Sequence, residues 1–157
     1  MDDYDEALAL WMNTPGMGLN NLDDSKEGIQ KYLLRNPDTN FVAREDGKLI
    51  GVILSGHDGR RGMIYHAAVE TSQRKRGIGR RLVDAAIAAL RNEGINKASI
   101  VVFRENITGN AFWEKLGFAE RSDLVYRNKV ITNKDMKQIP AAAFMFHPPV
   151  DYNDRKQ

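Results

Sequence analysis

Apolar residues recur with a helical spacing in four parts of the chain. The clearest case lies between Gly77 and Arg91, where apolar residues follow one another every three or four positions and so line one face of a helix. Ser25 is a suitable N-cap for an earlier helix, and Gly94 is a suitable stop after the long one. The pattern predicts helices over residues 3–12, 25–34, 77–91 and 109–116.

Other segments carry the continuous or alternating apolar patterns of β-strands. "FVAREDGKLIGVILSG" is typical of two strands joined at Asp46-Gly47, and Asp58-Gly59 predicts another reversal. Strands that alternate with helices, together with hairpins, predict an α/β or α+β domain of three layers around one mixed sheet. The expected strands lie within residues 41–56 (two strands), 63–70, 97–103, 118–120 and 124–131.

The composition describes one globular domain without a membrane span. The chain has 157 residues, of which 42% are hydrophobic and 28% charged, and no apolar run approaches the ~20 residues that cross a bilayer. The acidic N-terminus does not resemble a signal peptide. There are no cysteines, and His57, His66 and His147 lack metal-ligand spacing, so we expect no disulfide and no metal site. Cytoplasmic residence is the simplest expectation.

Charge is distributed unevenly although the formal net charge is only +2. Basic residues cluster between Arg60 and Arg81. Acidic residues gather near the N-terminus, at Asp2, Asp3, Asp5, Glu6, Asp23 and Asp24. The local electrostatics therefore matter more than the net charge.

The stretch "SQRKRGIGRRL", residues 72–82, follows a predicted strand and opens a predicted helix. It contains neither a P-loop nor a dinucleotide fingerprint, because no Gly-Lys-Ser/Thr occurs and Leu82 stands where a third glycine is needed. Glycines at a helix N-terminus let an anion approach the unpaired N–H groups, so this stretch favours a pyrophosphate site. The alternatives are an ordinary solvated basic turn and a nucleic-acid patch, although no aromatic residues are interleaved for base stacking.

Two motifs resemble those of the GNAT superfamily of N-acetyltransferases. R-x-x-G-x-G, formed by Arg74, Gly77 and Gly79, resembles the acetyl-CoA motif of that family, and "ENITGNAFWEKLGF" is similar to its later N-x(6)-Y-x-x-L-G-[FY] segment. The resemblance covers roughly residues 3–131. It implies the GNAT fold, with helices on both faces of a mixed sheet that splays between the fourth and fifth strands. The expected division is a GNAT domain over residues 1–131 and a C-terminal arm over residues 132–157.

The resemblance also implies a binding site for acetyl-CoA. The backbone of Ala68 and Val69 would pair with the pantetheine arm, while Asn106 and Trp113 would contact the cofactor from the later motif. The pyrophosphate would lie on the backbone amides of the glycine turn, formed by Arg74, Lys75, Arg76, Gly77, Ile78, Gly79 and Arg80.

The implied reaction is direct attack of a primary amine on the acetyl thioester. A base must take the proton of the amine, and His66 and Glu105 are the candidates. The family usually carries an acidic tyrosine where this chain has Trp113, whose indole N–H is not a useful acid at neutral pH. Tyr65, Tyr126 or solvent would then protonate the thiolate. The N-terminal acids would suit a cationic amine on a small molecule or peptide, although solvated helix faces explain them equally well.

The family's first strand has no counterpart before residue 3, so an edge of the sheet is expected to be open. We expect the C-terminal arm, through Phe144, Met145 and Phe146, to cover apolar surface within the chain or on a partner in a homodimer. Two other functions stay open at this stage: a non-catalytic acyl-CoA-binding module and, less favoured, a nucleic-acid-binding protein.

Overall fold

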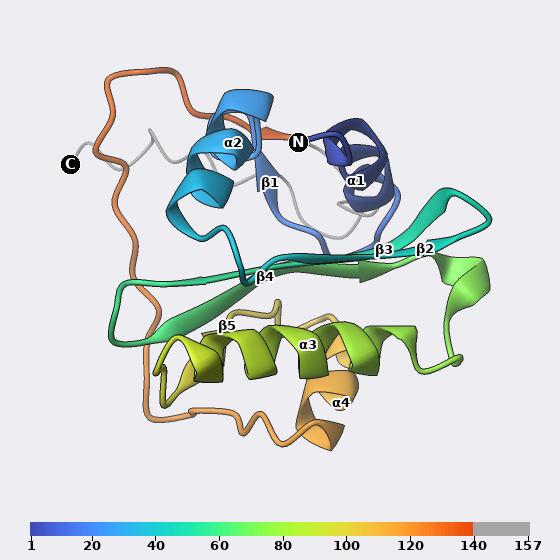
Figure 1. The fold of residues 1–157 in the computed structure, drawn as a ribbon. Helices are drawn as coiled ribbons and strands as arrows, with labels where there is room; N and C mark the ends of the chain where they lie inside the picture. Colours follow the sequence, from blue (N-terminus) through green and yellow to red (C-terminus); the bar gives the residue numbers. More distant parts are fainter. Residues whose placement is uncertain (140–157) are drawn as a thin grey trace.

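Helices cover both faces of a four-stranded sheet (Figure 1). A computed structural model describes residues 1–139. Helices α1 and α2 lie on one face of the sheet, and α3 and α4 lie on the other. The elements in chain order are α1 (Tyr4–Met12), β1 (Leu19–Asn20), α2 (Lys26–Arg35), β2 (Phe41–Glu45), β3 (Lys48–His57), β4 (Gly62–Val69), the 3₁₀ turn η1 (Thr71–Gln73), α3 (Ile78–Asn92), β5 (Ala98–Ile100), α4 (Ile107–Lys115) and β6 (Gln138–Ile139).

The strand order of the main sheet is β2-β3-β4-β5. The first three strands are antiparallel hairpin partners, whereas β5 is parallel to β4. This parallel pairing joins Gly62, Met63 and Ile64 of β4 to β5, and the rest of β4 pairs only with β3. The mixed sheet is therefore splayed between β4 and β5, the fourth and fifth strands in chain order, as expected.

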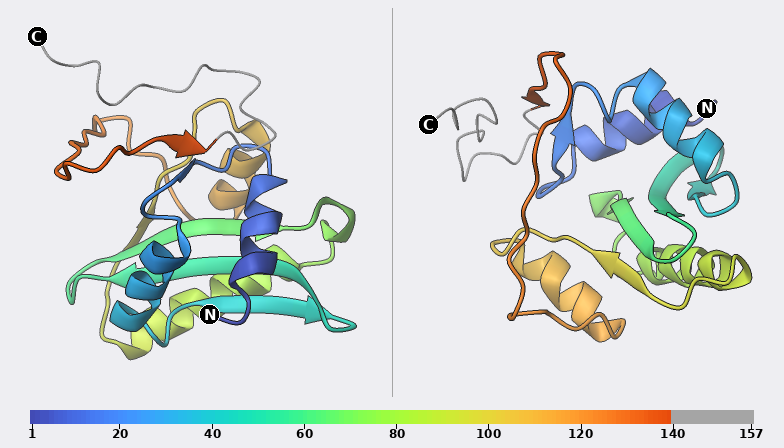
Figure 2. Two further views of the ribbon diagram at one scale, coloured as in Figure 1. Left: turned by 90° about the horizontal axis from the view of Figure 1, so that it is seen from above. Right: turned by 90° about the vertical axis from the view of Figure 1, so that its left-hand side faces the viewer.

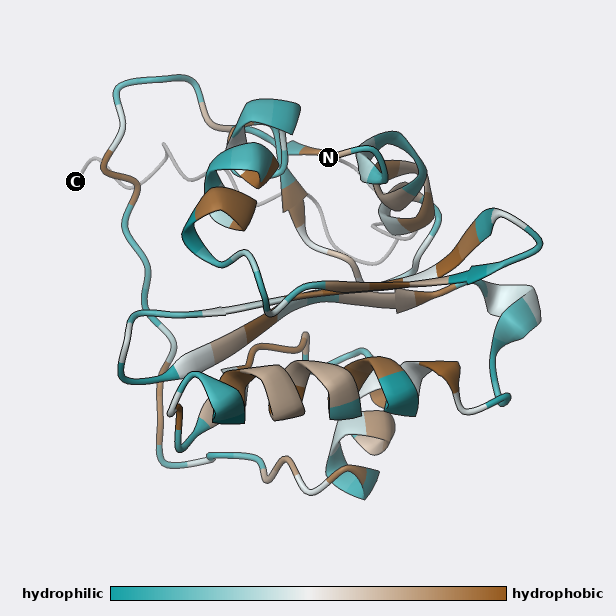
Figure 3. Ribbon diagram, in the orientation of Figure 1, coloured by the Kyte–Doolittle hydropathy of each residue, from teal (hydrophilic) through white to brown (hydrophobic). Residues whose placement is uncertain are grey.

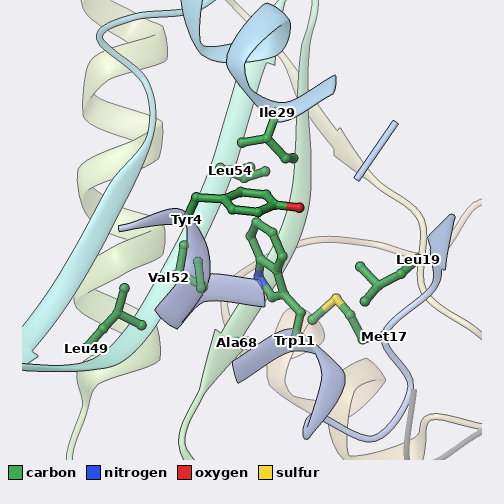
Figure 4. Close-up of a cluster of buried hydrophobic side chains, with 10 residues drawn as sticks. Tyr4, Trp11, Met17, Leu19, Ile29, Leu49, Val52, Leu54 and Ala68 are labelled. Carbon is green, nitrogen blue, oxygen red and sulfur yellow. The ribbon is translucent and has the colours of Figure 1, made fainter. Parts of the chain in front are cut away.

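Two clusters of buried side chains hold the layers together. The first cluster lies under α1 and α2 and includes Tyr4, Trp11 and Ala68 (Figure 4). The second lies under α3 and α4 and includes Ile53 and Ala86, neither of which is exposed at all. In Figure 3 the central strands are largely hydrophobic and the turns hydrophilic, which is the pattern that a sheet covered on both faces requires.

The predicted helices and hairpins are confirmed at their boundaries. Ser25 caps α2, because its Oγ accepts the N–H of Gly28 at 3.1 Å. Asp46 and Gly47 both have positive φ angles, as the tight turn between β2 and β3 requires. The long helix begins one residue after Gly77 and ends just before Gly94, whose φ of +76° continues the chain in the left-handed region.

The prediction for the later strands is wrong. Only Ala98–Ile100 of the expected strand over residues 97–103 is paired, and residues 118–131 form no strand. Val101 and Val125 are exposed, and no described strand lies beyond β5. A β-prone sequence without a neighbour to bond its N–H and C=O groups does not form a strand.

The short pair β1 and β6 was not expected from the sequence. Figure 2 shows it apart from the main sheet, where Leu19 pairs with Ile139 and Asn20 with Gln138. Ile139 packs against the first cluster and so brings the beginning of the expected arm to the N-terminal half of the chain. Phe144, Met145 and Phe146 lie outside the described residues, and the division of the chain at residue 131 stays a prediction.

Candidate active site

The unpaired side of β4 presents the backbone of Val69 at the splay. The N–H of Glu70 donates to the carbonyl of Ile50 at 2.9 Å, and this bond points toward β3. Because successive residues of a strand point their backbone groups to opposite sides, the N–H and C=O of Val69 point away from β3, and those of Ala68 point toward it. Of the two residues in the predicted pantetheine site, Val69 is thus the one with backbone groups facing the splay.

The glycine turn leads from this strand into α3. Gly77 is the N-cap residue of α3 and has a φ of +79°, and Lys75 before it has a φ of +63°. No side chain of residues 1–139 caps the helix, and its first turn contains no acidic residue. A Cβ on Gly77 would meet no atom within 4 Å. The N–H groups of the first turn therefore lack a side-chain acceptor on an open surface, which is the geometry that binds an anion.

Gly79 has a different role from Gly77. A Cβ on Gly79 would lie 3.3 Å from the ring of Phe112 in α4 and 3.6 Å from the Val69 side chain. Ile78 between the two glycines is buried in the second cluster. Gly77 thus supplies a left-handed backbone, whereas Gly79 allows the start of α3 to pack closely against α4.

The basic side chains of the turn differ in their freedom to meet a phosphate. Arg76 forms two bonds to Glu45, at 2.6 and 3.0 Å, and this hydrogen bonding raises the pKa of the Arg76 guanidinium. Arg74 donates its Nε–H to the Val69 carbonyl at 3.2 Å. The Nε of Arg80 lies 3.6 Å from Oδ2 of Asp84, and 68% of the Arg80 side chain is exposed. Lys75 is also exposed. The charge of Arg76 is largely neutralised by its partner, while Lys75 and Arg80 extend into solvent.

The residues of the later motif have structural tasks in α4. The Oδ1 of Asn106 accepts the N–H of Gly109 at 2.9 Å and so caps the helix. Trp113 is 7% exposed and lies between Phe112 and Phe118, with ring centroids 5.1 Å away on each side. The indole is thus part of the second hydrophobic cluster.

His66 occupies a β-bulge in β4. The pairing shifts between Val52, opposite Ala68, and Leu54, opposite Tyr65, so one extra residue is accommodated in β4. His66 has a φ of +44°, which is uncommon for a residue with a side chain and costs on the order of 1–3 kcal/mol. The surrounding structure holds it there, because Trp11 donates its indole N–H to the His66 carbonyl at 3.0 Å.

Asp24 holds the ring of His66. Nε2 of His66 contacts Oδ1 of Asp24, and the other oxygen of Asp24 accepts the N–H of Asn20 at 2.6 Å. Asp24 is 4% exposed and the side chain of His66 is 15% exposed. A carboxylate only accepts hydrogen bonds, so in the neutral form of the ring this contact puts the proton on Nε2 and leaves Nδ1 as an acceptor.

Three tyrosines and one glutamate complete the set of predicted catalytic residues and their neighbours. Tyr65 packs edge-on against Tyr32 of α2, with ring centroids 5.9 Å apart, and the Tyr32 hydroxyl is buried without a hydrogen-bond partner among the described residues. Burial, followed by the nearby Tyr126, raises the pKa of Tyr65. Glu105 is exposed in the turn before α4, apart from the buried contacts of His66.

Sequence reasoning gave His66 and Asp24 separately but not their contact. The two residues are 42 positions apart, and the bulge that turns His66 toward Asp24 has no sequence signature of its own. For Trp11, the sequence predicts only a place in the helix over residues 3–12. A tryptophan N–H inside an apolar face needs an acceptor, and this was the one available sign of a bond to the backbone.

Comparison with known proteins places this arrangement in a family. The model of the Acetyltransferase (GNAT) family matches residues 6–118. The chain belongs to the GNAT family of N-acetyltransferases. Among curated relatives, an acetyltransferase of Yersinia pestis (strain Pestoides F) is 26% identical over 134 residues, covering 85% of this chain and 94% of its own. An acetyltransferase of Photorhabdus laumondii is 28% identical over 140 residues, with the same coverage.

Solved structures show the same fold at lower identity. The aminoglycoside 6′-N-acetyltransferase AAC(6')-Ig from Acinetobacter haemolyticus is 18% identical, with a TM-score of 0.64 and coverage of 83% of this chain and 94% of that one. A Mycobacterium tuberculosis protein solved in complex with CoA is 17% identical, with a TM-score of 0.59 and coverage of 84% and 72%. These structures therefore establish the GNAT fold of this GNAT protein.

The helices of residues 1–139 include no membrane span, and the side chains of these residues form no metal-binding cluster. None of these helices is long and apolar enough to span a membrane. Within the same residues, no three His, Asp or Glu side chains lie together as metal ligands would.

Proposed function

We propose that this N-acetyltransferase uses acetyl-CoA and transfers its acetyl group to a primary amine by direct attack. The observation that carries the proposal is the uncapped N-terminus of α3 beside the backbone of Val69, which faces the splay and is not paired with β5. One feature suits a pyrophosphate and the other an amide-containing arm, and the two are joined by the glycine turn.

The residues present fit acetyl-CoA. The amides from Arg74 to Arg80 would hold the pyrophosphate, with Lys75 and Arg80 as nearby positive charge, and Val69 would bond to the pantetheine arm. Arg74 now donates to the Val69 carbonyl and would have to release it. When bound, acetyl-CoA supplies an acetyl group activated as a thioester.

His66 is the base that the geometry favours over Glu105. Its Nδ1 can accept the proton of the acceptor amine while Asp24 holds Nε2 and orients the ring. A positioned base of this kind contributes about 10²–10⁴-fold to the rate. Glu105 is exposed and lies in a turn, where its position is less well fixed.

Tyr65 is the favoured acid because Trp113 is buried in a hydrophobic cluster. Tyr65 and His66 are adjacent at the bulge, and Tyr65 faces α2, where it contacts Tyr32. A tyrosine hydroxyl is protonated at neutral pH and so has a proton to donate, and burial, which raises the pKa of Tyr65, makes it a weaker acid than a tyrosine in water. Tyr126, which is 69% exposed, is less firmly positioned.

The acceptor is a primary amine of a small molecule or a peptide. The N-terminal acids give less support to a cationic acceptor than their number suggests, because Asp3 and Glu6 bond to Arg44 and Asp24 bonds to His66. Solved proteins of the same fold are named for aminoglycosides, for glucosamine-6-phosphate and for the alanine of a ribosomal protein, so the acceptor panel should include sugars and peptides.

An acceptor screen with acetyl-CoA tests the proposal. Release of the CoA thiol is measured with amino sugars, polyamines and peptide N-termini, and acetyl-CoA binding is measured separately by calorimetry. We expect binding without an acceptor and thiol release with at least one amine. Absence of acetyl-CoA binding would refute the cofactor assignment, whereas release with hydroxyl acceptors alone would refute the amine assignment.

A further inference from the structure

The guanidinium of Arg74 lies on the side of β4 that faces the splay. Its Nε–H donates to the carbonyl of Val69 at 3.2 Å, and that carbonyl points away from β3 and is not paired with β5. Arg74 belongs to the turn that leads from the end of β4 into α3 (Figure 1). The Nε–H therefore takes the position that the N–H of a neighbouring strand would take on this carbonyl.

Val69 itself is held firmly. Its side chain packs against the second cluster, as does that of Phe112 in α4. The start of α3 approaches it closely, because a Cβ on Gly79 would lie 3.6 Å from the Val69 side chain. The N–H of the next residue, Glu70, bonds to the carbonyl of Ile50 in β3 at 2.9 Å. The Val69 carbonyl is thus fixed in direction, and a group that binds it must come to it.

The Arg74 side chain, by contrast, can leave its bond. It is exposed, and its distance of 3.2 Å from the Val69 carbonyl is at the long end of the usual range. Among residues 1–139 no carboxylate forms an ion pair with Arg74, whereas Arg76 is bonded twice to Glu45. A single bond from an exposed guanidinium to a neutral carbonyl contributes little net stability, so a stronger partner can draw Arg74 away.

A phosphate at the glycine turn is such a partner. The amides that would hold the pyrophosphate of acetyl-CoA follow Arg74 directly in the chain, from Lys75 to Arg80. Hydrogen bonds to an ionised group are about twice as strong as those between neutral groups, and a guanidinium matches a phosphate with two parallel N–H groups. Pantetheine without the nucleotide offers only neutral groups and would have to displace Arg74 without this help.

We propose that Arg74 selects thioesters of coenzyme A over thioesters of pantetheine alone. The guanidinium covers the Val69 carbonyl in the free protein, and the pyrophosphate draws it away as the pantetheine arm takes its place. A ligand without the pyrophosphate binds only those molecules in which the carbonyl is uncovered, and its apparent affinity is reduced by that fraction. The inference rests on the proposed use of acetyl-CoA, and it assigns a side chain to the choice between two donors of the same acetyl group.

Binding of two acetyl donors to the full-length chain tests the proposal. S-acetylpantetheine carries the arm and the thioester without a phosphate, and acetyl-CoA carries all three. Arg74→Met removes both the donor and the charge. We expect this variant to bind S-acetylpantetheine about two- to fivefold more tightly than the natural protein, and acetyl-CoA about two- to fivefold less tightly. NMR titration to millimolar concentrations measures the weaker ligand, and calorimetry measures acetyl-CoA.

Arg80→Met is the matched control. It removes an equal charge from the same turn, but the bond of Arg80 goes to Asp84 and not to Val69. Binding of acetyl-CoA should therefore weaken as in Arg74→Met, and binding of S-acetylpantetheine should stay unchanged. Opposite changes for the two ligands in Arg74→Met alone support the proposal.

Two results would overturn the selection by Arg74. One is unchanged, weaker or undetected binding of S-acetylpantetheine by Arg74→Met. The other is a gain for this ligand in both variants, because the lost charge rather than the lost bond to Val69 would then be the cause. Failure of the natural protein to bind acetyl-CoA is a different result, and it would refute the cofactor assignment itself.

Discussion

Oδ1 of Asp24 contacts Nε2 of His66, and this single contact joins the loop before α2 to the bulge in β4. The bulge turns one residue of β4 into a left-handed conformation, and Trp11 and Asp24 hold its carbonyl and its ring. A strained residue that is held from two sides suggests a functional position, because the structure maintains it at a cost in stability.

Replacing His66 should reduce acetyl transfer without reducing cofactor binding. We expect His66→Gln to lower kcat about 10²–10⁴-fold, since the base is removed, and to leave the Kd of acetyl-CoA unchanged. Asp24 is a positioning residue, so Asp24→Asn should lower kcat about tenfold or more by releasing the ring. Steady-state kinetics and calorimetry measure the two quantities.

Matched variants separate this role from a loss of folding. Asp23 is in the same loop and bonds to the side chain of Asn20, at 2.9 Å, and His57 lies at the far end of β3. Asp23→Asn and His57→Gln should both keep kcat near that of the natural protein. If Asp24→Asn retained full kcat, the positioning role would be wrong.

Gly77 should tolerate asparagine better than alanine. Its φ of +79° is left-handed, and a Cβ there meets no atom, so the cost of a substitution comes from the backbone alone. We expect Gly77→Ala to lower the free energy of unfolding by about 1–2 kcal/mol and Gly77→Asn by less, because asparagine enters this region more readily. Urea denaturation measures both. If the alanine variant were as stable as the natural protein, the left-handed backbone would not be the reason for a glycine at position 77.

Restoring the family's tyrosine at Trp113 should not restore an acid. The indole fills space between Phe112 and Phe118, so Trp113→Tyr would leave a gap and place a hydroxyl in an apolar cluster. We expect a loss of about 1–3 kcal/mol in stability and no increase in kcat. Trp113→Phe is the control without a hydroxyl. A tenfold gain in kcat for the tyrosine variant alone would show that the position is catalytic.

The charges of the glycine turn should contribute unequally to acetyl-CoA binding. Lys75→Gln and Arg80→Gln should each weaken binding about two- to fivefold, the factor that corresponds to roughly 0.3–1 kcal/mol for a charge near a helix N-terminus. Arg76→Gln should have a smaller effect because Glu45 already neutralises Arg76, and Glu45→Gln should tighten binding. Titrations at low and high salt measure these effects, which should shrink as salt rises. If Arg76→Gln lost more affinity for acetyl-CoA than Lys75→Gln and Arg80→Gln, the predicted order would be wrong.

The sequence predicted those parts of the fold that depend on local patterns. Ser25, the turn at Asp46 and the glycine turn before α3 are local features, because each fixes the backbone within a few residues. The prediction of the later strands was wrong because strand formation depends on residues that are distant in sequence. Leu124 and Val125 have a strand-like sequence, but a strand needs a partner, and the local sequence does not say whether one is present.

In the candidate site, too, the local features could be predicted from the sequence and the contacts between distant residues could not. The glycine turn lies within one short stretch and was located from its spacing alone. The contact between His66 and Asp24 depends on a shift of pairing between β3 and β4, which places a ring on a loop that is distant in sequence. The roles of Asn106 and Gly79 in helix capping and packing likewise became evident only from their neighbours in space.

Glu6 should make the stability of the N-terminal helix depend on pH. Its carboxylate accepts the backbone N–H of Leu49 at 2.9 Å and a bond from Arg44 at 2.7 Å, and these bonds, the first above all, lower the pKa of Glu6. A lowered pKa in the folded state means that the stabilisation is present above the pKa of the unfolded chain and is lost as the pH falls through the folded value. Glu6→Gln should therefore be less stable than the natural protein at neutral pH, and the difference should shrink below about pH 4.

Thermal unfolding between pH 3 and pH 7 measures this difference, with Glu114→Gln as the control. Glu114 is an exposed glutamate of α4, and its replacement should leave the melting temperature close to that of the natural protein across the range. The bonds of Glu6 join α1 to β3 and β2, so the loss should appear as earlier opening of α1. A difference that stayed constant as the pH fell would show that the side chain acts through packing rather than through its charge.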